Sequence, residues 1–354
     1  MKQRLLSLDV MRGMTVFFMI IVNNGVGPDH YDQLDHSRWN GLTCCDLVFP
    51  FFLFMVGVSI WFSLGGRKSD GSTHLKILGR TLRMFLIGVA LHAWDAWVGG
   101  KSDILAHLRV WGVLERISLC YGIVSLLVLY VHPRQLWKFI IGLLVLYGVL
   151  LLVGNGYAQD ESNWASIIDR AICGPDHLYH KSAVDPEGLM GTISAVAHTL
   201  LGVCVGYLVK GRDSLTVRML RMLMVAWLLI VLGGLVMAVG FPLNKRIWSP
   251  SYVLVTCALA TFLLVLLTFL IDGMGLQRWS RLFQAFGMNA FFLYVLSEML
   301  APVAGRYEVG DWLYVRFHDV MSSPLSSLCY SLLFVLVVAI PGWILFRKRI
   351  FIKI

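Results

Sequence analysis

The sequence predicts an all-α, polytopic integral membrane protein with about ten transmembrane helices, and three observations lead to this fold class. Of the 354 residues, 58% are hydrophobic and only 14% are charged, whereas a soluble domain carries roughly 25% charged residues. The hydrophobic residues gather in stretches long enough to cross a bilayer core, which takes about 20 apolar residues per helix. Backbone polar groups in lipid must be satisfied within each segment, and the stretches lack the alternation of membrane-barrel strands. We therefore expect lipid to cover most of the surface.

The predicted spans follow one another along the whole chain and form a single domain, 1–354. They cover approximately residues 5–24, 43–64, 77–97, 111–131, 136–154, 189–209, 217–240, 252–272, 282–302 and 325–346. Three connections, 25–42, 155–188 and 303–324, are predicted to lie outside the cytoplasm. No cleavable signal peptide is expected, because the first hydrophobic stretch lacks a small-residue cleavage site.

Lysine and arginine residues indicate the orientation of the chain. With the N-terminus in the cytoplasm, most of the 30 lysines and arginines fall at cytoplasmic ends and loops, among them the run Arg347-Lys348-Arg349. An even number of spans then places both termini inside. The net charge of +9 is thus explained by topology, and no nucleic-acid partner is expected. The cysteines fall mainly in or beside the spans, which is not the pattern of a disulfide framework.

Polar and ionisable residues lie in or beside the predicted spans on one side of the bilayer, and such residues within a membrane are functional candidates by default. They belong to the outer half or the middle of the membrane, and a protein that only anchored or scaffolded would not need them. The residues are Asn23, Asn24, His36, Asp46, His92, Asp95, Glu115, Arg116, Asp185, Glu187, His198, Lys245, Arg246, Asn289 and Glu298.

Several of these residues also have a purely structural interpretation. Glu115 and Arg116 are neighbours that point about 100° apart on a helix, so each can pair with a different helix. His92 and His198 can be hydrogen-bonded core residues, and Lys245 can belong to a solvated loop. Both interpretations stay open for each residue.

A metal site is not expected. His177 and His180, preceded by Asp176, have a spacing that occurs at metal sites. They form a lone pair in a polar loop, however, and no third ligand is in view, whereas a structural zinc ion takes four.

The stretch 23–50 combines the residues of an acid–base site. His36 lies in a turn-rich loop, Asn23 and Asn24 end the first span, and Asp46 begins the second. If the loop folds back, Asp46 can accept a hydrogen bond from one imidazole nitrogen and leave the other as a base. The amide of Asn23 or Asn24 could donate to an oxyanion. The alternative is a polar re-entrant turn without chemistry.

At these residues the sequence resembles the heparan-α-glucosaminide N-acetyltransferase family of transmembrane acyltransferases, in a compact, bacterial-type form. The resemblance covers essentially the whole chain and rests on several motifs in the same order. They are RLLSLDVMRGMTVFFMIIVNN at 4–24, HSRWNGLTCCDLVFPFFLFMVGVSI at 36–60, GVLERISLCY at 112–121, DPEGLMGTISAVAHTLLG at 185–202, LNKRIWSPSYVL at 243–254, GMNAFFLYVLSE at 287–298 and the terminal RKRIFIKI. One departure is Glu115, where the family more usually has glutamine.

The resemblance implies an enzyme that moves an acetyl group from cytoplasmic acetyl-CoA to an amino sugar on the extracytoplasmic side of the inner membrane. It implies that His36, Asn23 and Asp46 are the catalytic residues. His36 would act as the base or, alternatively, as a nucleophile that carries the acetyl group. The family also suggests a homodimer. No metal takes part in this scheme, and acetyl-CoA is the co-substrate.

Binding residues are predicted on both sides of this site. The sugar would be held by the substrate-side residues Asn24, Trp39, Asn40, Asp185, Glu187 and Glu298. Acetyl-CoA would be held by Arg80, Arg83 and Asn289. For Trp39 we expect stacking on a pyranose ring, although tryptophan is common at membrane interfaces in any case.

A transporter of amino sugars or oligosaccharides is the alternative function. Ten helices with a polar cluster near the membrane centre also suit transport. The sequence shows no evident inverted repeat, and a fixed histidine–carboxylate pair favours chemistry. A structural or assembly protein would leave the polar cluster unexplained.

Overall fold

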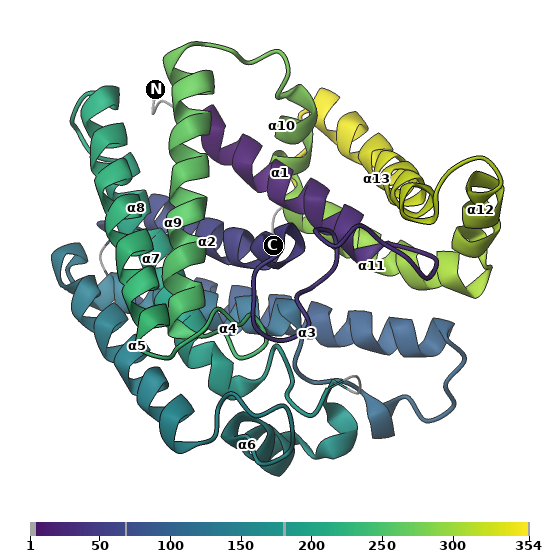
Figure 1. The fold of residues 1–354 in the computed structure, drawn as a ribbon. Coiled ribbons are helices and arrows are strands. Elements are labelled where there is room, and N and C mark those ends of the chain that lie inside the picture. The colour runs from purple at the N-terminus through teal and green to yellow at the C-terminus, as the bar shows by residue number, and fades with distance from the viewer. Residues whose placement is uncertain (1–4, 68, 180–181, 353–354) are drawn as a thin grey trace.

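The computed structural model describes residues 5–67, 69–179 and 182–352, and within these ranges every regular element is a helix (Figure 1). The predicted all-α class is confirmed. Nine helices of the described chain are long and apolar enough to cross a membrane, and a bent pair can supply a tenth span. The nine are α1 (Leu6–Asn23), α2 (Cys44–Leu64), α3 (Gly71–Val98), α4 (Val113–Tyr130), α5 (Leu136–Val153), α7 (Leu189–Val209), α8 (Leu215–Ala238), α9 (Pro250–Leu267), which continues as a π-helical turn over Thr268–Gly273, and α13 (Ser323–Arg347).

The long helices divide into an inner and an outer group. Within the most apolar stretch of each helix, the buried share is 78% in α7 but only 17% in α3 and 22% in α8. The outer helices turn leucine-rich faces away from the protein, as on α3 with Leu75, Leu78, Leu82 and Leu86. Such faces suit lipid, because a bilayer core does not penalise exposed apolar side chains.

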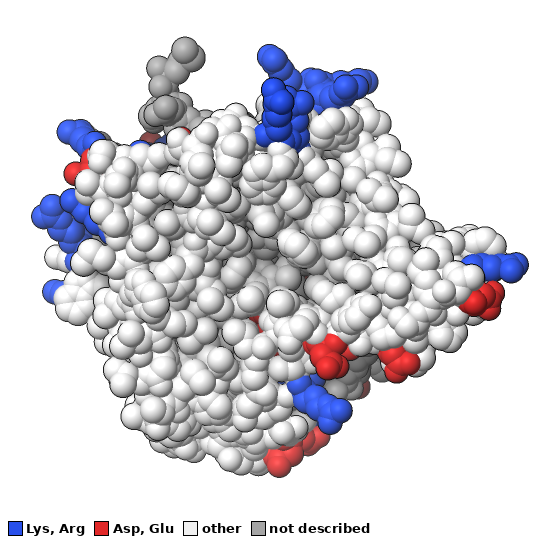
Figure 2. All heavy atoms as spheres, turned by 45° about the horizontal axis from the view of Figure 1, so that its top comes forward, with Lys and Arg blue, Asp and Glu red and all other residues white. Residues whose placement is uncertain are grey.

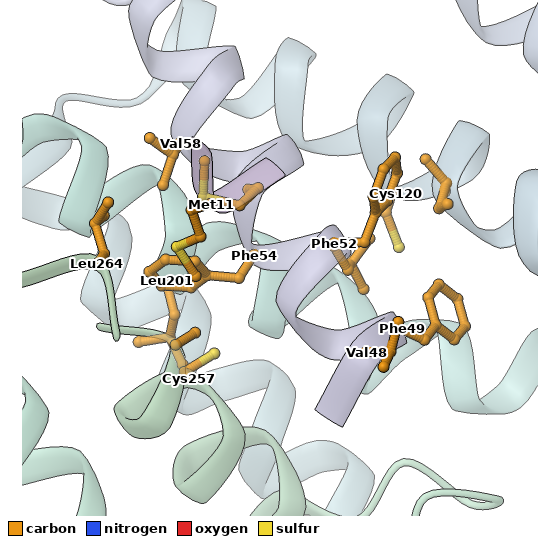
Figure 3. Packing of buried hydrophobic residues seen from close by; sticks show 14 of the residues in the cluster. Met11, Val48, Phe49, Phe52, Phe54, Val58, Cys120, Leu201, Cys257 and Leu264 are labelled. Carbon is orange, nitrogen blue, oxygen red and sulfur yellow. The ribbon is translucent and has the colours of Figure 1, made fainter. Parts of the chain in front are cut away.

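Helix α2 forms the centre of the inner group and packs against α1, α4, α7 and α9. Its side chains meet residues of these neighbours in one continuous apolar core, in which Phe54 and Val58 lie near Met11, Leu201 and Leu264 (Figure 3). The crossing with α7 is especially close, because Gly57 and Gly202 oppose backbone carbonyl oxygens of the partner helix. The core therefore fixes the position of α2, whose first turn carries Asp46.

The predicted ninth span, 282–302, is not one continuous helix. The structure divides this region into α10 (Arg281–Met288) and α11 (Ala290–Arg306), which meet at an angle of 84°. Asn289 lies at the break, and its side chain hydrogen-bonds the backbone of Ile350 and Ile352. The packing of Gly287 against the backbone of Asp9 in α1 also fixes the bend.

Two of the predicted outside connections contain short helices. Helix α6 (Trp164–Cys173) lies in 155–188, and α12 (Val309–His318) lies in 303–324. Charged residues lie mainly at the margins of the molecule in this view. Much of the face between them shows neither the blue of Lys and Arg nor the red of Asp and Glu (Figure 2). This distribution suits a protein whose middle is surrounded by lipid.

Candidate active site

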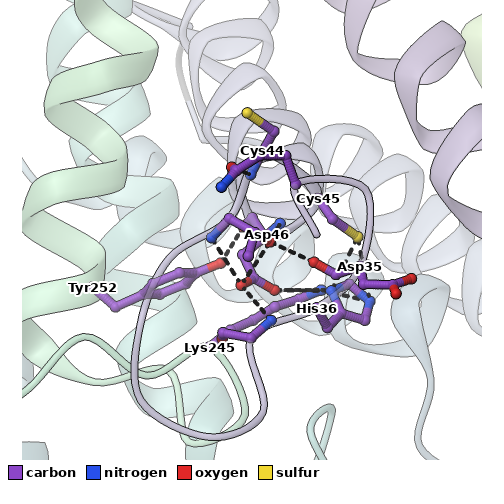
Figure 4. Close-up of polar contacts among 10 residues, drawn as sticks. Asp35, His36, Cys44, Cys45, Asp46, Lys245 and Tyr252 are labelled. Carbon is purple, nitrogen blue, oxygen red and sulfur yellow. Dashed lines mark hydrogen bonds and ion pairs between the residues drawn. The ribbon is translucent and has the colours of Figure 1, made fainter. Parts of the chain in front are cut away.

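The candidate site lies where the loop between α1 and α2 returns to the first turn of α2 (Figure 4). The Nδ1 atom of His36 lies 2.8 Å from Oδ1 of Asp46, so the loop does fold back, which is the condition on which the acid–base interpretation depended. The Asp46 side chain is fully buried, whereas that of His36 is 51% exposed. When Nδ1–H donates to the carboxylate, Nε2 keeps its lone pair and can accept a proton.

The first turn of α2 explains why Asp46 is held in one orientation. Thr43 is the N-cap residue, and its hydroxyl accepts a hydrogen bond from the Asp46 N–H at 3.3 Å. In return, Oδ2 of Asp46 accepts from the backbone N–H of Thr43 at 3.2 Å and from that of Ser37 at 3.1 Å. This reciprocal arrangement is a capping box. It orients the second oxygen, Oδ1, toward His36.

A proline one turn further along α2 ties the same residue to α9. Pro50 has no N–H and cannot donate to the carbonyl of Asp46 four residues earlier. The hydroxyl of Tyr252 donates to that carbonyl instead, at 2.6 Å. In the same turn, the carbonyl of Pro50 is 2.9 Å from Nε2 of His198 on α7. The buried histidine therefore has the structural role that the sequence left open.

Lys245 is a residue of the site that the sequence left undecided. Its Nζ lies 3.0 Å from Nδ1 and 3.2 Å from Nε2 of His36, and 3.7 Å from Oδ1 of Asp46. The thiol of Cys45 also approaches Nδ1 of His36, at 3.1 Å. The sequence named Lys245 among the ionisable candidates, but it could not show the contact with His36, which joins residues 209 positions apart.

The two asparagines at the end of α1 have different surroundings. Asn23 is exposed, and its amide donates to Oε1 of Glu298 at a distance of 3.5 Å. Asn24 is buried, and its amide donates to the carbonyl of Ile20 at 2.7 Å. In the described part of the chain no hydrogen bond joins either amide to His36. The oxyanion role of Asn23 and the substrate roles of Asn24 and Glu298 stay predictions.

Trp39 and Asn40 are close to the site in sequence, but both contact protein. The Trp39 ring is 8% exposed, and its Nε1 donates to the carbonyl of Tyr157 at 3.1 Å. The side-chain oxygen of Asn40 accepts from the amide of Asn244 at 3.0 Å. Trp39 thus packs into a small core beside α5, and in this arrangement its ring is not presented for stacking on a sugar. Their roles in substrate binding stay predictions.

Asp185 and Glu187, which precede α7, share one arginine. Nη2 of Arg109 donates to Oδ1 of Asp185 at 2.8 Å and to Oε2 of Glu187 at 2.7 Å. Burial alone would raise the pKa of Glu187, but the charge of Arg109 beside it holds the value below its ordinary range. Arg109 thus bridges the two carboxylates, and a sugar ligand would have to share this cluster.

Glu115 and Arg116 pair with different elements, as their structural interpretation predicted. Oε1 of Glu115 lies 3.8 Å from Nε2 of His92 on α3. Neither carboxylate oxygen of this buried side chain has a hydrogen-bond partner among the described residues. Arg116 donates to the carbonyl of Gly188 at 2.8 Å and lies over the ring of Trp248.

A cavity of about 620 Å³ opens between α1, α2, α3, α4 and the break before α11. Arg80 and Asn289, two of the predicted acetyl-CoA ligands, line it together with Arg12 and Ser59. The third, Arg83, is not among the lining residues, and its Nε donates to the carbonyl of Gly79. The amide of Asn289 is engaged by the C-terminal segment, whose Phe351 and Ile352 also line the cavity.

The candidate metal pair is only partly described. His180 lies outside the described residues, and Nδ1 of His177 is 2.8 Å from the carbonyl of Leu108. No cluster of three or more possible metal ligands occurs in residues 5–67, 69–179 and 182–352.

Comparison with known proteins gives concordant matches. Residues 4–178 match the family model described as "Heparan-alpha-glucosaminide N-acetyltransferase, catalytic". Two curated relatives, the heparan-alpha-glucosaminide N-acetyltransferases of Mus musculus and Homo sapiens, are each 30% identical to the chain over 412 and 410 residues. Each alignment covers 99% of this chain and 60% of the relative, so the chain spans about 60% of the length of these proteins.

Proposed function

The chain belongs to the heparan-alpha-glucosaminide N-acetyltransferase family, and from this premise we propose that it transfers the acetyl group of acetyl-CoA to the amino group of a glucosamine-type sugar. The observation that carries the proposal is the His36–Asp46 pair, an exposed imidazole oriented by a buried carboxylate. An acetyl thioester is already activated. The enzyme must then place the two substrates and remove one proton from the attacking amine.

In the proposed reaction, His36 takes a proton from the acceptor nitrogen as that nitrogen attacks the thioester carbonyl. The C–S bond breaks, and the CoA thiolate receives a proton, so that the products are the amide and free CoA. Asp46 holds the imidazole and stabilises the imidazolium that forms in between. Asn23 is the proposed donor to the carbonyl oxygen if its amide turns from Glu298.

The cavity between α2 and α4 is the proposed donor site. It reaches Phe52 on α2, and between Asp46 and Phe52 the helix rises only about 9 Å. The thin pantetheine arm could cover this distance while the nucleotide stays at the basic end of the molecule. We propose that this end faces the cytoplasm of the cell and that the sugar reaches His36 from the other side of the inner membrane. A homodimer is proposed on the family resemblance alone.

The purified protein is expected to release free CoA thiol from acetyl-CoA when glucosamine is present, with N-acetylglucosamine as the product. Thiol release is followed with a thiol reagent and the product by mass spectrometry. In proteoliposomes with acetyl-CoA trapped inside and glucosamine outside, the product should form outside. Glucosamine uptake without acetyl-CoA consumption would instead support the transporter alternative.

Replacing Arg80 by glutamine is expected to raise the KM for acetyl-CoA about tenfold with little change in kcat. A hydrogen bond to a charged partner contributes about 1.5–3 kcal/mol, and about 1.4 kcal/mol corresponds to a factor of ten. Steady-state kinetics with varied acetyl-CoA measure the effect. Arg134→Gln, which removes an exposed cation between α4 and α5, is the control. An equal KM in both variants would contradict the donor site.

A further inference from the structure

Lys245 reaches the candidate catalytic histidine from the loop between α8 and α9 (Figure 4). Its Nζ lies 3.0 Å and 3.2 Å from the two ring nitrogens of His36. The lysine side chain is 13% exposed, so most of its length is enclosed by protein while the imidazole beside it is half-exposed. A cation is therefore held at the edge of the space that a substrate would enter.

Lys245 also forms an ion pair with the buried carboxylate of Asp46, whose charge is not cancelled by hydrogen bonds from neutral donors. Oδ2 of Asp46 already accepts from two backbone N–H groups, and Oδ1 accepts from His36. The lysine nitrogen is nearer to both ring nitrogens than to Oδ1, from which it is separated by 3.7 Å. The ammonium is thus directed at the imidazole more than at the carboxylate.

The position of the ammonium leaves His36 available as a base. An atom almost equidistant from both ring nitrogens cannot lie along the in-plane lone pair of Nε2. The ammonium lies beside the part of the ring where Cε1 joins the two nitrogens. The ammonium therefore does not occupy the in-plane direction of Nε2, toward which the N–H group of an acceptor would point, and Sγ of Cys45 lies 3.8 Å from the same nitrogen. The reacting carbonyl would lie next to both His36 and Lys245.

The backbone around Lys245 is fixed by hydrogen bonds. Its carbonyl accepts from the N–H of Trp248, and the N–H of Ser249 donates to the carbonyl of Asn244. The fully buried Asn244 also links this turn to Asn40 of the histidine loop at 3.0 Å. A cation on such a support is preorganised and needs little rearrangement during a reaction.

From these contacts we propose that Lys245 is a catalytic residue of the acetyl transfer, in which its ammonium binds the thioester carbonyl oxygen. This inference rests on the proposed function. As the amine lone pair forms the C–N bond, the electrons of the C=O double bond move to oxygen, and Lys245 stabilises the oxyanion. When the double bond reforms, the C–S electrons leave with sulfur, and His36 delivers to the thiolate the proton that it took from nitrogen.

The test compares Lys245→Met with Lys245→Arg in the purified full-length chain, with glucosamine as acceptor. Loss of one oxyanion donor typically lowers kcat about 10²–10³-fold, and we expect this loss in Lys245→Met with little change in either KM. Lys245→Arg keeps the charge and should recover part of kcat. With fluoroacetyl-CoA, whose carbonyl is more electrophilic, the loss in Lys245→Met should become smaller.

Arg246→Met removes the adjacent cation and serves as the control for a general charge effect. The inference is overturned if Lys245→Met retains the wild-type kcat. A purely structural residue would behave differently. The inference is therefore also overturned if Lys245→Met loses thermal stability and its kcat falls by the same factor with acetyl-CoA and with fluoroacetyl-CoA. In either case a wild type that consumes acetyl-CoA leaves the proposed function standing. A wild type that consumes none with any amine overturns the proposed function itself.

Discussion

Replacing His36 by alanine is expected to lower kcat/KM for acetyl transfer about 10³-fold, within the range of 10²–10⁴ typical of a positioned general base. The variant loses the imidazole that the buried carboxylate of Asp46 orients through a hydrogen bond. Because the imidazole is 51% exposed, its removal should leave the fold intact. Thiol release from acetyl-CoA with glucosamine measures the rate, and thermal unfolding in the same detergent measures stability.

His30→Ala is the matched control for this experiment. His30 lies in the same loop and pairs with Asp35 at 3.0 Å, so its loss removes an imidazole without touching the His36–Asp46 pair. We expect this variant to keep near wild-type turnover. Full turnover in His36→Ala would refute the assignment of the site, whatever the behaviour of the control.

The same pair of variants separates the two roles open to His36. A nucleophilic histidine would carry the acetyl group, so radiolabelled acetyl-CoA without acceptor should label the wild type and His30→Ala but not His36→Ala. A general base would leave all three unlabelled and require both substrates together. The exposed imidazole is compatible with either role.

The sequence predicted the spans well because their signals are local. Hydropathy depends only on neighbouring residues, and nearly all predicted spans agree with observed helices to within a few residues. Local patterns of this kind need no knowledge of the tertiary fold. The pairing of His36 with Asp46 was predicted only on the condition that the loop between them folds back, which the sequence left open.

The remaining features depend on residues that are distant in sequence. The contact of Lys245 with His36 and the sharing of Arg109 by Asp185 and Glu187 follow from helix packing. The bend at Asn289 depends on the C-terminal segment, 350–352, which no hydropathy window near residue 289 includes. An apolar run continues through this break, so the pattern predicted one uninterrupted span over 282–302.

The crossing of α2 and α7 is expected to be the most sensitive point of the fold, because it decides where Asp46 lies. Apolar side chains gain little by leaving lipid, so transmembrane helices associate through close packing at small residues. A Cβ atom at Gly202 would collide with the carbonyl oxygen of Phe54, and one at Gly57 with that of Thr199. Backbone atoms cannot turn aside as a flexible side chain could.

Gly202→Val should therefore separate the two helices and cost about 3 kcal/mol or more, at the upper end of typical overpacking losses. Gly234→Val is the control, because a Cβ there meets no atom within 4 Å, and surface changes of this kind usually stay within about 0.5 kcal/mol. Thermal unfolding and size-exclusion chromatography in one detergent compare the variants. Since α2 holds Asp46 at its first turn, the shift should also impair acetyl transfer in any Gly202→Val protein that still folds. Equal unfolding temperatures for the two variants would show that the crossing can widen without loss, and the position of Asp46 would then have to depend on Thr43 and Tyr252 alone.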